Sequence, residues 1–370
     1  MKTLKRILAA TTLLVTLGFA SEANAQVPLE NFFKNPEKAG YQISPDGKYF
    51  SYMAPYENRL NLFVQEVGSD KATRITSETV RDLAGSMWAN GHRILYIKDT
   101  AGDENFQLYG VNVDGTDSKA YTAFPKVRTT IIDPLENIDS LVIIGLNKRN
   151  PQVFDPYRLN LNNGELTQLA ENPGNIQGWM TDHNGKLRVA LAIVDGVNTQ
   201  ILYRETEEQP FRPVLTTNFK ETVSFATFTP DNKMVYALTN IGRDKTALVL
   251  MDPATCEEKE VLYTNDKYDI SGLGYSELKK KLISVSCTGH KGTIRHYFDK
   301  NEEAIRTKLE QKLEGYDINT TSEDKSENIR IIYAGGDRTY GTYYTYNVKE
   351  DKLTKIADLA PWIKEEDMVP

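Results

Sequence analysis

"YQISPDGKYFSYMAP" (Tyr41–Pro55) predicts two β-strands joined by a tight turn. Pro45 presets its own φ, Asp46 can accept a hydrogen bond from a nearby backbone N–H, and Gly47 tolerates the positive φ that such a turn needs. After the turn, side chains alternate between two faces over residues 49–54, as they do in a strand. The fold depends on whether this strand pair stands alone or repeats.

The strand pair repeats. Similar pairs have their turns near residues 46, 90, 136, 184, 231, 277 and 326, so neighbouring turns are 44, 46, 48, 47, 46 and 49 residues apart. Seven copies at nearly constant spacing indicate a repeat architecture.

Each copy has a second half of its own. An aromatic-containing strand, a turn of Asp, Asn and Gly, and a short strand recur at 61–76, 107–122, 155–170, 201–216, 247–263 and 342–357. One unit is therefore four antiparallel strands in about 45 residues, the size of a propeller blade. We expect an all-β fold, a seven-bladed β-propeller of four-stranded antiparallel blades over residues 39–362.

The sixth unit departs from this pattern, because residues 298–315 predict a short helix inserted in blade six. Asp299 is the expected N-cap and Gly315 the expected C-cap. Charged pairs are expected at Glu302–Arg306 and Arg306–Glu310. A narrow apolar line consists of Ile305, Leu309 and Leu313. The helix is expected to lie on a surface, either on its own blade or on a neighbouring domain.

The first 25 residues predict a signal peptide. Lys2, Lys5 and Arg6 precede an apolar stretch from Ile7 to Ala20, which is too short to span a bilayer, and Ala23-Asn24-Ala25 is a small-x-small cleavage site. Cleavage after Ala25 would place the protein in the periplasm or outside the cell, whereas an uncleaved anchor is the alternative. No later segment has ~20 consecutive apolar residues, so no membrane insertion is expected after cleavage. Residues 26–38 form an N-terminal arm that either adds a strand to the last blade or lies against a further domain.

The charge balance is acidic. The whole chain carries −7, and loss of three basic residues and Glu22 with the signal peptide leaves 41 basic and 50 acidic residues, a net charge of −9. A chain of this charge repels phosphate backbones and anionic lipid, so nucleic acid is not an expected partner.

No nucleophile elbow is present in the sequence. The G-x-S-x-G motif needs small residues around the serine, and its nearest match is "GYSEL" (Gly274–Leu278), which ends in leucine. The residues after it predict a strand rather than a helix. Ser276 is therefore not predicted to be catalytic, and no other catalytic residue is assigned.

Other reactive side chains give no site. Cys287, His290 and His296 offer zinc ligands but lack a fourth at a recognisable spacing, so strand-end and loop roles are expected and no metal or cofactor is assigned. His92 and His183 lie in hairpin turns and are expected to be exposed to solvent.

Two cysteines and two neighbouring acidic residues each allow two interpretations. Cys256 lies at a turn position where glycine is usual and Cys287 lies within a strand, so two independent thiols are expected rather than a disulfide. Asp103 and Glu104 lie in a long loop of blade two, where they form either a solvated turn or an acidic pair able to hold the α-amino group of a peptide.

The whole exported chain resembles the N-terminal propeller of the prolyl oligopeptidase family of serine peptidases, in its dipeptidyl- and acylaminoacyl-peptidase branch. The stretches that carry the resemblance are 27–55, 96–115, 145–176 and 352–368, of which "NKRNPQVFDPYRLN" (147–160) is the most particular. The resemblance implies a C-terminal α/β-hydrolase domain as partner, with the propeller limiting access to short peptides. No residue of the family's catalytic triad matches a position in this chain.

This resemblance favours a non-catalytic, substrate-gating propeller, inactive by itself, with residues 363–370 as the beginning of a linker toward the hydrolase domain. Two alternatives remain. One is a stand-alone periplasmic propeller similar to TolB-like proteins, which binds protein partners. The other is an enzyme with a site in the central channel of the propeller.

Overall fold

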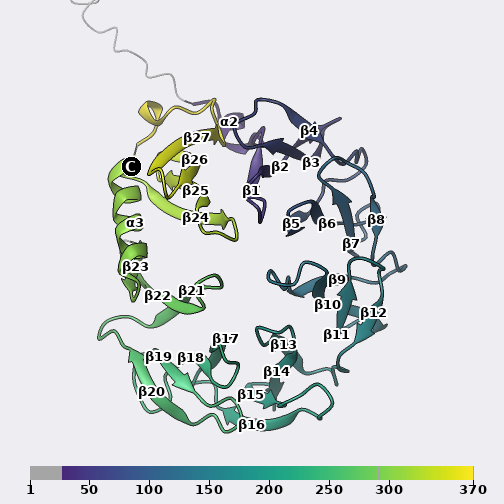
Figure 1. The fold of residues 1–370 in the computed structure, drawn as a ribbon, viewed down its shortest axis with the longest axis vertical. Coiled ribbons are helices and arrows are strands. Elements are labelled where there is room, and N and C mark those ends of the chain that lie inside the picture. The colour runs from purple at the N-terminus through teal and green to yellow at the C-terminus, as the bar shows by residue number, and fades with distance from the viewer. Residues whose placement is uncertain (1–26, 291, 370) are drawn as a thin grey trace, which may run out of the picture.

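Seven β-sheets surround a central axis in the computed structural model of the protein (Figure 1). The structure describes residues 27–290 and 292–369, so the predicted signal peptide lies outside the described residues. Six sheets have four strands and one has three, and each consists of consecutive strands paired antiparallel. The predicted seven-bladed β-propeller is confirmed.

The first four blades follow the chain in order. Their strands are β1 (Ala39–Ile43), β2 (Tyr49–Tyr56), β3 (Arg59–Glu66) and β4 (Ala72–Arg74); β5 (Gly85–Asn90), β6 (Arg93–Lys98), β7 (Gln107–Asn112) and β8 (Lys119–Ala120); β9 (Thr129–Asp133), β10 (Leu141–Asn150), β11 (Val153–Asn160) and β12 (Leu166–Gln168); and β13 (Ile176–Thr181), β14 (Leu187–Val194), β15 (Asn198–Tyr203) and β16 (Arg212–Thr217).

Blades five to seven complete the ring. Their strands are β17 (Val223–Phe228), β18 (Val235–Thr239), β19 (Ala247–Met251) and β20 (Glu258–Tyr263); β21 (Ile270–Ser276), β22 (Lys281–Gly289) and β23 (Gly292–Tyr297); and β24 (Asp317–Glu323), β25 (Ile329–Gly336), β26 (Thr339–Asn347) and β27 (Lys352–Asp358).

The turn of blade one has the predicted chemistry. The Ser44 hydroxyl donates to Asp46 Oδ1 over 2.7 Å and accepts from the Lys48 backbone N–H over 3.0 Å. Gly47 has a φ of 73°, in the left-handed region that favours glycine. A local network of this kind closes the strand pair without help from the rest of the molecule.

The antiparallel order gives the ring two distinct ends. The turn between the first and second strands of every blade lies at one end, which we call the first-turn end. Because each strand reverses the direction of the chain, β1 begins and β27 ends at the other end, which we call the terminal end. The turns between second and third strands, and the connections from one blade to the next, also lie at the terminal end.

The core lies between blades. One buried cluster joins Leu62 and Val64 of blade one to Ile94 and Tyr96 of blade two, and comparable clusters join blades two and three, four and five, five and six, and seven and one. Stacking thus buries sheet faces that a single meander would leave exposed. This burial is the main driving force for the ring.

No strand is shared where the ring closes, because blades one and seven are separate sheets. Ile331 of blade seven is fully buried in a cluster with Tyr41 and Ile43 of blade one. The Ile43 backbone N–H donates to Ser322 Oγ over 3.1 Å, and the Lys325 backbone N–H donates to the Pro45 carbonyl over 2.9 Å. Side-chain packing and isolated hydrogen bonds therefore hold this seam.

Blade six has three strands, and the helix α3 (Lys300–Lys312) follows its third strand at the rim of the ring (Figure 1). The predicted N-cap is confirmed, because Asp299 accepts hydrogen bonds from the backbone N–H groups of Asn301 and Glu302. The C-cap is Leu313 rather than Gly315.

The packing of α3 differs from the prediction. Its apolar line is buried as expected, but Leu309 and Leu313 pack on Ile332 and Tyr346, which belong to blade seven rather than to the helix's own blade. The chain is already crossing from blade six to blade seven at this point, so the nearest uncovered apolar face is that of the following blade.

One predicted ion pair on α3 forms and the other does not. Arg306 pairs with Glu310 over 2.6 Å. Glu302 is 8% exposed and instead binds the Arg330 guanidinium through both carboxylate oxygens, at 2.8 and 3.0 Å, and Lys279 at 2.7 Å. A buried carboxylate needs close cationic partners, and blades six and seven supply them.

The N-terminal arm forms the short helix α2 (Leu29–Phe33) and adds no strand to the last blade. Trp362 Nε1 donates to the Asn31 carbonyl over 2.9 Å, and the Tyr340 hydroxyl donates to the Phe32 carbonyl over 2.6 Å. The arm therefore lies at the terminal end, beside the last described residues and the 3-10 helix η1 (Glu365–Asp367). Within the described part of the chain, no helix has the length and apolar character needed to cross a membrane.

Candidate functional site

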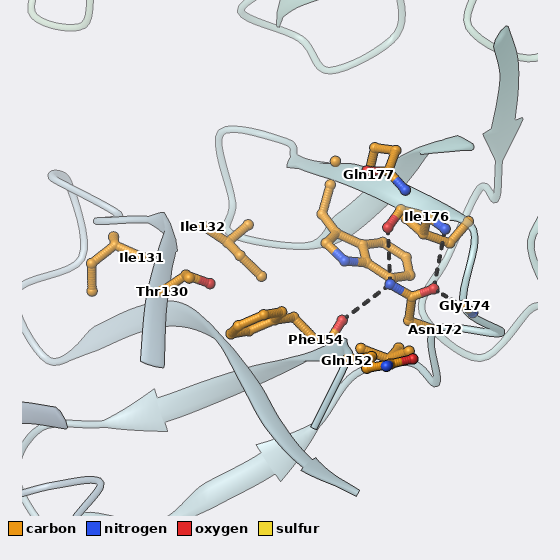
Figure 2. A pocket seen from close by; sticks show the side chains of 12 residues that line it. Thr130, Ile131, Ile132, Gln152, Phe154, Asn172, Gly174, Ile176 and Gln177 are labelled. Carbon is orange, nitrogen blue, oxygen red and sulfur yellow. Dashed lines mark hydrogen bonds between the residues drawn. The ribbon is translucent and has the colours of Figure 1, made fainter. Parts of the chain in front are cut away.

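A pocket of about 480 Å³ lies between blades three and four. Its walls come from the beginning of β9, the β10–β11 turn, the β12–β13 connection and the beginning of β13, all of which lie at the terminal end of the ring (Figure 2). The residues that line it are Thr130, Ile131, Ile132, Gln152, Val153, Phe154, Asn172, Gly174, Ile176, Gln177, Gly178 and Trp179.

The lining combines apolar and aromatic side chains with amide, hydroxyl and backbone polar groups, and it has no charged side chain. Polar atoms make up the larger part of its accessible surface. Ile132 and Phe154 supply apolar surface in this view (Figure 2), and Trp179 is a further aromatic lining residue. Gln152 and Gln177 supply donors and acceptors at the rim. A concave, uncharged surface of mixed polarity suits an uncharged ligand group that offers both apolar area and hydrogen-bonding atoms.

Asn172 holds the floor of the pocket in place. It is 4% exposed. Its Nδ2 donates to the carbonyls of Phe154 and Ile176 over 3.3 and 2.9 Å, and its Oδ1 accepts from the backbone N–H groups of Gly174 and Ile176 over 2.8 and 3.1 Å (Figure 2). One amide thus ties β11 to the connection that leads into β13.

An ion pair between the buried Asp155 and the exposed Arg149 supports Asn172 from behind. Asp155 is fully buried and accepts from Arg149 Nε and Nη2 over 2.9 and 3.0 Å, and from the Asn172 backbone N–H over 2.7 Å. Arg149 also donates to the Asn172 carbonyl over 2.7 Å. The hydrogen bond to Asp155 raises the pKa of Arg149 above its ordinary value. The pair fixes the β10–β11 turn against the floor of the pocket.

The sequence assigned no role to any single lining residue. The stretch 147–160, the most particular part of the resemblance, nevertheless contains Gln152, Val153 and Phe154 of the lining as well as Arg149 and Asp155. The remaining lining residues belong to β9, β13 and the connection before β13, and no local pattern predicts that they meet.

Ser276 has a structural role. It is 4% exposed at the end of β21, where its hydroxyl donates to Glu327 Oε1 of blade seven and accepts from the Lys279 backbone N–H over 2.9 Å. Both bonds stabilise the first turn of blade six.

The three residues considered as zinc ligands, Cys287, His290 and His296, all belong to blade six but contact different side chains. His296 stacks on Tyr263 with ring centroids 4.5 Å apart, and His290 meets the edge of Tyr268 at 5.8 Å. Cys287 is buried in the core between blades. Among residues 27–290 and 292–369, no group of three or more His, Cys, Asp and Glu side chains is arranged to hold a metal ion.

The two turn histidines differ from each other. His92 is exposed, as predicted. The prediction of an exposed His183 is wrong, because its ring stacks on Tyr275 of blade six at 5.3 Å and its Nε2 lies 2.9 Å from the Phe228 carbonyl. Its turn is at the first-turn end, where the turns of several blades meet.

The acidic pair forms a self-contained turn. Asp103 and Glu104 are both exposed. Asp103 accepts from the side chain and the backbone N–H of Asn105, and these bonds lower the pKa of its carboxyl group. The pair nevertheless lies at the terminal end, like the pocket, because the β6–β7 loop is a second turn.

The thiols lie in separate environments. Cys256 and Cys287 form no disulfide. Cys256 has a φ of 56° at its turn, which agrees with the glycine-like position expected from the sequence. Burial, with a smaller effect from Asp252, raises the pKa of its thiol to about 11, so the thiolate that reacts is scarce at neutral pH.

A second hollow, of about 570 Å³, lies at the terminal end beside the last described residues. It is open and lined by the charged residues Arg338, Lys364, Glu365 and Glu366. Because it is the more open of the two, it is a poorer binding site for a small ligand than the pocket between blades three and four.

Two curated proteins resemble the chain over nearly its whole length. It is 28% identical over 350 residues to dipeptidyl aminopeptidase BIII of Pseudoxanthomonas mexicana, which covers 91% of this chain and 49% of that protein. It is 26% identical over 355 residues to dipeptidyl peptidase family member 6 of Caenorhabditis elegans, which covers 90% of this chain and 47% of that protein. The chain spans about half the length of the curated relatives it matches. No family model matches the chain.

A solved structure shows the same fold. A chain from a structural study of two prolyl endopeptidases superposes with a TM-score of 0.60 at 12% identity, covering 94% of this chain and 55% of that one. TolB from Acinetobacter baumannii gives a TM-score of 0.36 at 17% identity over 60% of this chain. Sequence relatives and fold agree, and the predicted resemblance to the propeller of the prolyl oligopeptidase family of peptidases is confirmed.

Proposed function

We propose that the chain is the substrate-gating propeller portion of an exported peptidase of the prolyl oligopeptidase family that acts on short peptides. The observation that carries the proposal is its similarity to dipeptidyl peptidases over about half of their length. In this proposal an α/β-hydrolase domain supplies the catalytic residues, and the propeller by itself is inactive.

The geometry of the terminal end supports the proposal. The uncharged pocket between blades three and four opens there, and both ends of the described chain lie there as well. On α2, Leu29 is 73% exposed and Phe33 is 79% exposed, which leaves apolar surface for a neighbouring domain. A hydrolase domain docked at this end would face the pocket, and the pocket would receive an apolar side chain of the bound peptide.

The first experiment compares the purified chain with a longer protein that includes the coding sequence downstream of it. Dipeptidyl and acyl-aminoacyl amides serve as substrates. We expect hydrolysis only by the longer protein, and we expect its added sequence to contain G-x-S-x-G followed by Asp and His. Hydrolysis by the chain alone would contradict the proposed division of roles.

The second experiment tests the pocket. Dipeptides carrying alanine, leucine or phenylalanine are titrated against the purified chain by calorimetry. In Trp179→Ala we expect the phenylalanine dipeptide to bind at least about tenfold more weakly, which is about 1.4 kcal/mol, with little change for the alanine dipeptide. Trp179→Phe should retain most of the affinity.

Phe219→Ala is the matched control, because it removes an aromatic ring that is 76% exposed and does not line the pocket. Equal weakening by Phe219→Ala and Trp179→Ala would count against the pocket as the binding site. Export is tested separately, by sequencing the N-terminus of the protein recovered from the periplasm or medium, where we expect Gln26 to be the first residue.

A further inference from the structure

The turn between β9 and β10, residues 134–140, is the longest of the turns between first and second strands in the described part of the chain. In Figure 1 it extends from blade three toward the middle of the ring. Turns of this kind usually contact only the neighbouring blades, because each blade packs only on the next. The contacts of this turn reach much farther.

Two polar contacts join this turn to the opposite side of the ring. Asn137 Nδ2 donates to Glu277 Oε2 of blade six over 2.9 Å. Lys325 Nζ of blade seven donates to Asp139 Oδ1 over 2.7 Å. In a ring of seven, blades six and seven are the two farthest from blade three. A turn that reaches both must therefore cross the axis.

Contacts on the near side hold the same turn. Leu135 is 7% exposed, and together with Ile138 it lies against Gly185 in the first turn of blade four, where a Cβ atom would come within 3.2 Å of both side chains. The Asn90 side chain of blade two donates to the Asp139 carbonyl over 3.2 Å. Apolar and polar contacts from four other blades thus fix residues 134–140.

Glu136 is exposed, as are Asn137 and Asp139. The protein nearby nevertheless removes enough solvent to raise the pKa of the Glu136 carboxyl group above its ordinary value. The carboxylates of Glu277 and Asp133 add to this rise, while Lys325 opposes it. Glu277 is in turn 3.3 Å from His183 Nδ1 of blade four.

We propose that residues 134–140 form a plug that closes the axis of the ring at the first-turn end, held by Lys325 and Glu277 from the opposite side. Peptides would then reach the pocket between blades three and four from the terminal end and not along the axis from the plugged end. The plug is inferred only from the contacts of residues 134–140. The route of peptides is inferred from the plug together with the proposed function.

A zero-length cross-link tests the central contact. Carbodiimide joins an amine and a carboxylate only when they touch, so the purified chain should yield a Lys325–Asp139 amide, found by mass spectrometry of a tryptic digest. Lys98 and Glu78, which are 2.6 Å apart, give the positive control. The product should be lost in Lys325→Arg, because a guanidinium does not react. A Lys98–Glu78 product without a Lys325–Asp139 product would overturn the plug.

Hydrogen exchange tests whether the turn is held. In the double variant Lys325→Met with Asn137→Ala, amides of residues 135–141 should exchange at least about tenfold faster than in the unmodified chain. Lys355→Met is the matched control, because it removes an exposed lysine paired with Asp358 over 2.7 Å on the same blade. Unprotected amides in the unmodified chain, or an unchanged turn in the double variant, would refute the plug.

The route of peptides is tested separately, by the rate at which the phenylalanine dipeptide binds. If peptides come from the terminal end, the double variant should bind the phenylalanine dipeptide with an association rate within about twofold of the unmodified chain. A markedly faster association would show passage along the axis and overturn this part of the inference. The cross-linking and exchange experiments involve no peptide, so their failure would leave the proposed function untouched.

Discussion

At the scale of single residues, the shape of the pocket depends on Asn172 and Asp155, whose side chains hold the backbone around it in place. Asn172 satisfies four backbone groups at once, and Asp155 holds its backbone N–H. Buried backbone groups left without partners are costly, so the shape of the pocket is tied to one amide side chain. Asn172 thus acts on the binding surface through the backbone of its neighbours.

Asn172→Ala is expected to destabilise the protein by about 2 to 3 kcal/mol, because it leaves several buried backbone groups without hydrogen bonds. Urea unfolding followed by circular dichroism measures the change. Asn163→Ala, in an exposed turn of the same blade, should cost less than about 0.5 kcal/mol. Equal effects of the two substitutions would contradict the role given to Asn172.

At the scale of secondary-structure elements, α3 shows how tertiary contacts override helix patterns. The spacing of Glu302 and Arg306 predicts a surface pair, but Glu302 turns inward to Arg330 and Lys279. Burial alone would raise the pKa of Glu302, but the hydrogen bonds from Arg330 and Lys279 prevail and lower it below the ordinary value of 4.5. Through these two partners, Glu302 holds α3 against blades six and seven.

Glu302→Gln should destabilise the protein by about 3 kcal/mol at pH 7, because it leaves Arg330 buried without its anionic partner. The pKa of Glu302 is lowered in the folded state, so its stabilising effect is present above pH 4.5 and disappears as the pH falls through the lower folded value. The gap between the unmodified chain and the variant, measured by urea unfolding, should therefore narrow below pH 4.5.

Glu310→Gln provides the comparison, since its pair with Arg306 is on the exposed face of the same helix. It should cost no more than about 0.5 kcal/mol. A pH-independent effect of Glu302→Gln would argue that the side chain matters for packing and not for its charge.

At the scale of the whole molecule, the ring closes without a shared strand, so the seam between blades one and seven depends on packed side chains. Neighbouring residues on β25 lie on opposite faces of blade seven. Ile331 packs on blade one, and Ile332 packs on α3. Both are fully buried.

Ile331→Ala and Ile332→Ala should each destabilise the protein by about 2 to 5 kcal/mol, because each leaves a cavity in a core. Hydrogen exchange should separate them. Ile331→Ala should speed the exchange of amides in β1, across the seam, and Ile332→Ala should speed the exchange of amides in α3. Faster exchange in the same segments for both variants would show that the seam is not a distinct unit.

The sequence by itself determined the number of blades, their order and, in every blade but the sixth, their four strands. Turn chemistry such as that of Pro45, Asp46 and Gly47 acts within a few residues, and the spacing of about 45 residues records one supersecondary unit at a time. The N-cap at Asp299 was predictable for the same reason, because a cap involves only the next turn of the helix.

Only the tertiary structure decided which distant residues meet. The pocket brings β9 together with β13, the ion pair of Lys325 with Asp139 crosses the ring, and His183 is covered by Tyr275. These contacts join residues up to 186 positions apart, and they exist only once the seven blades have closed into a ring. Local patterns specify each blade, whereas contacts between blades follow from the curvature and closure of the ring.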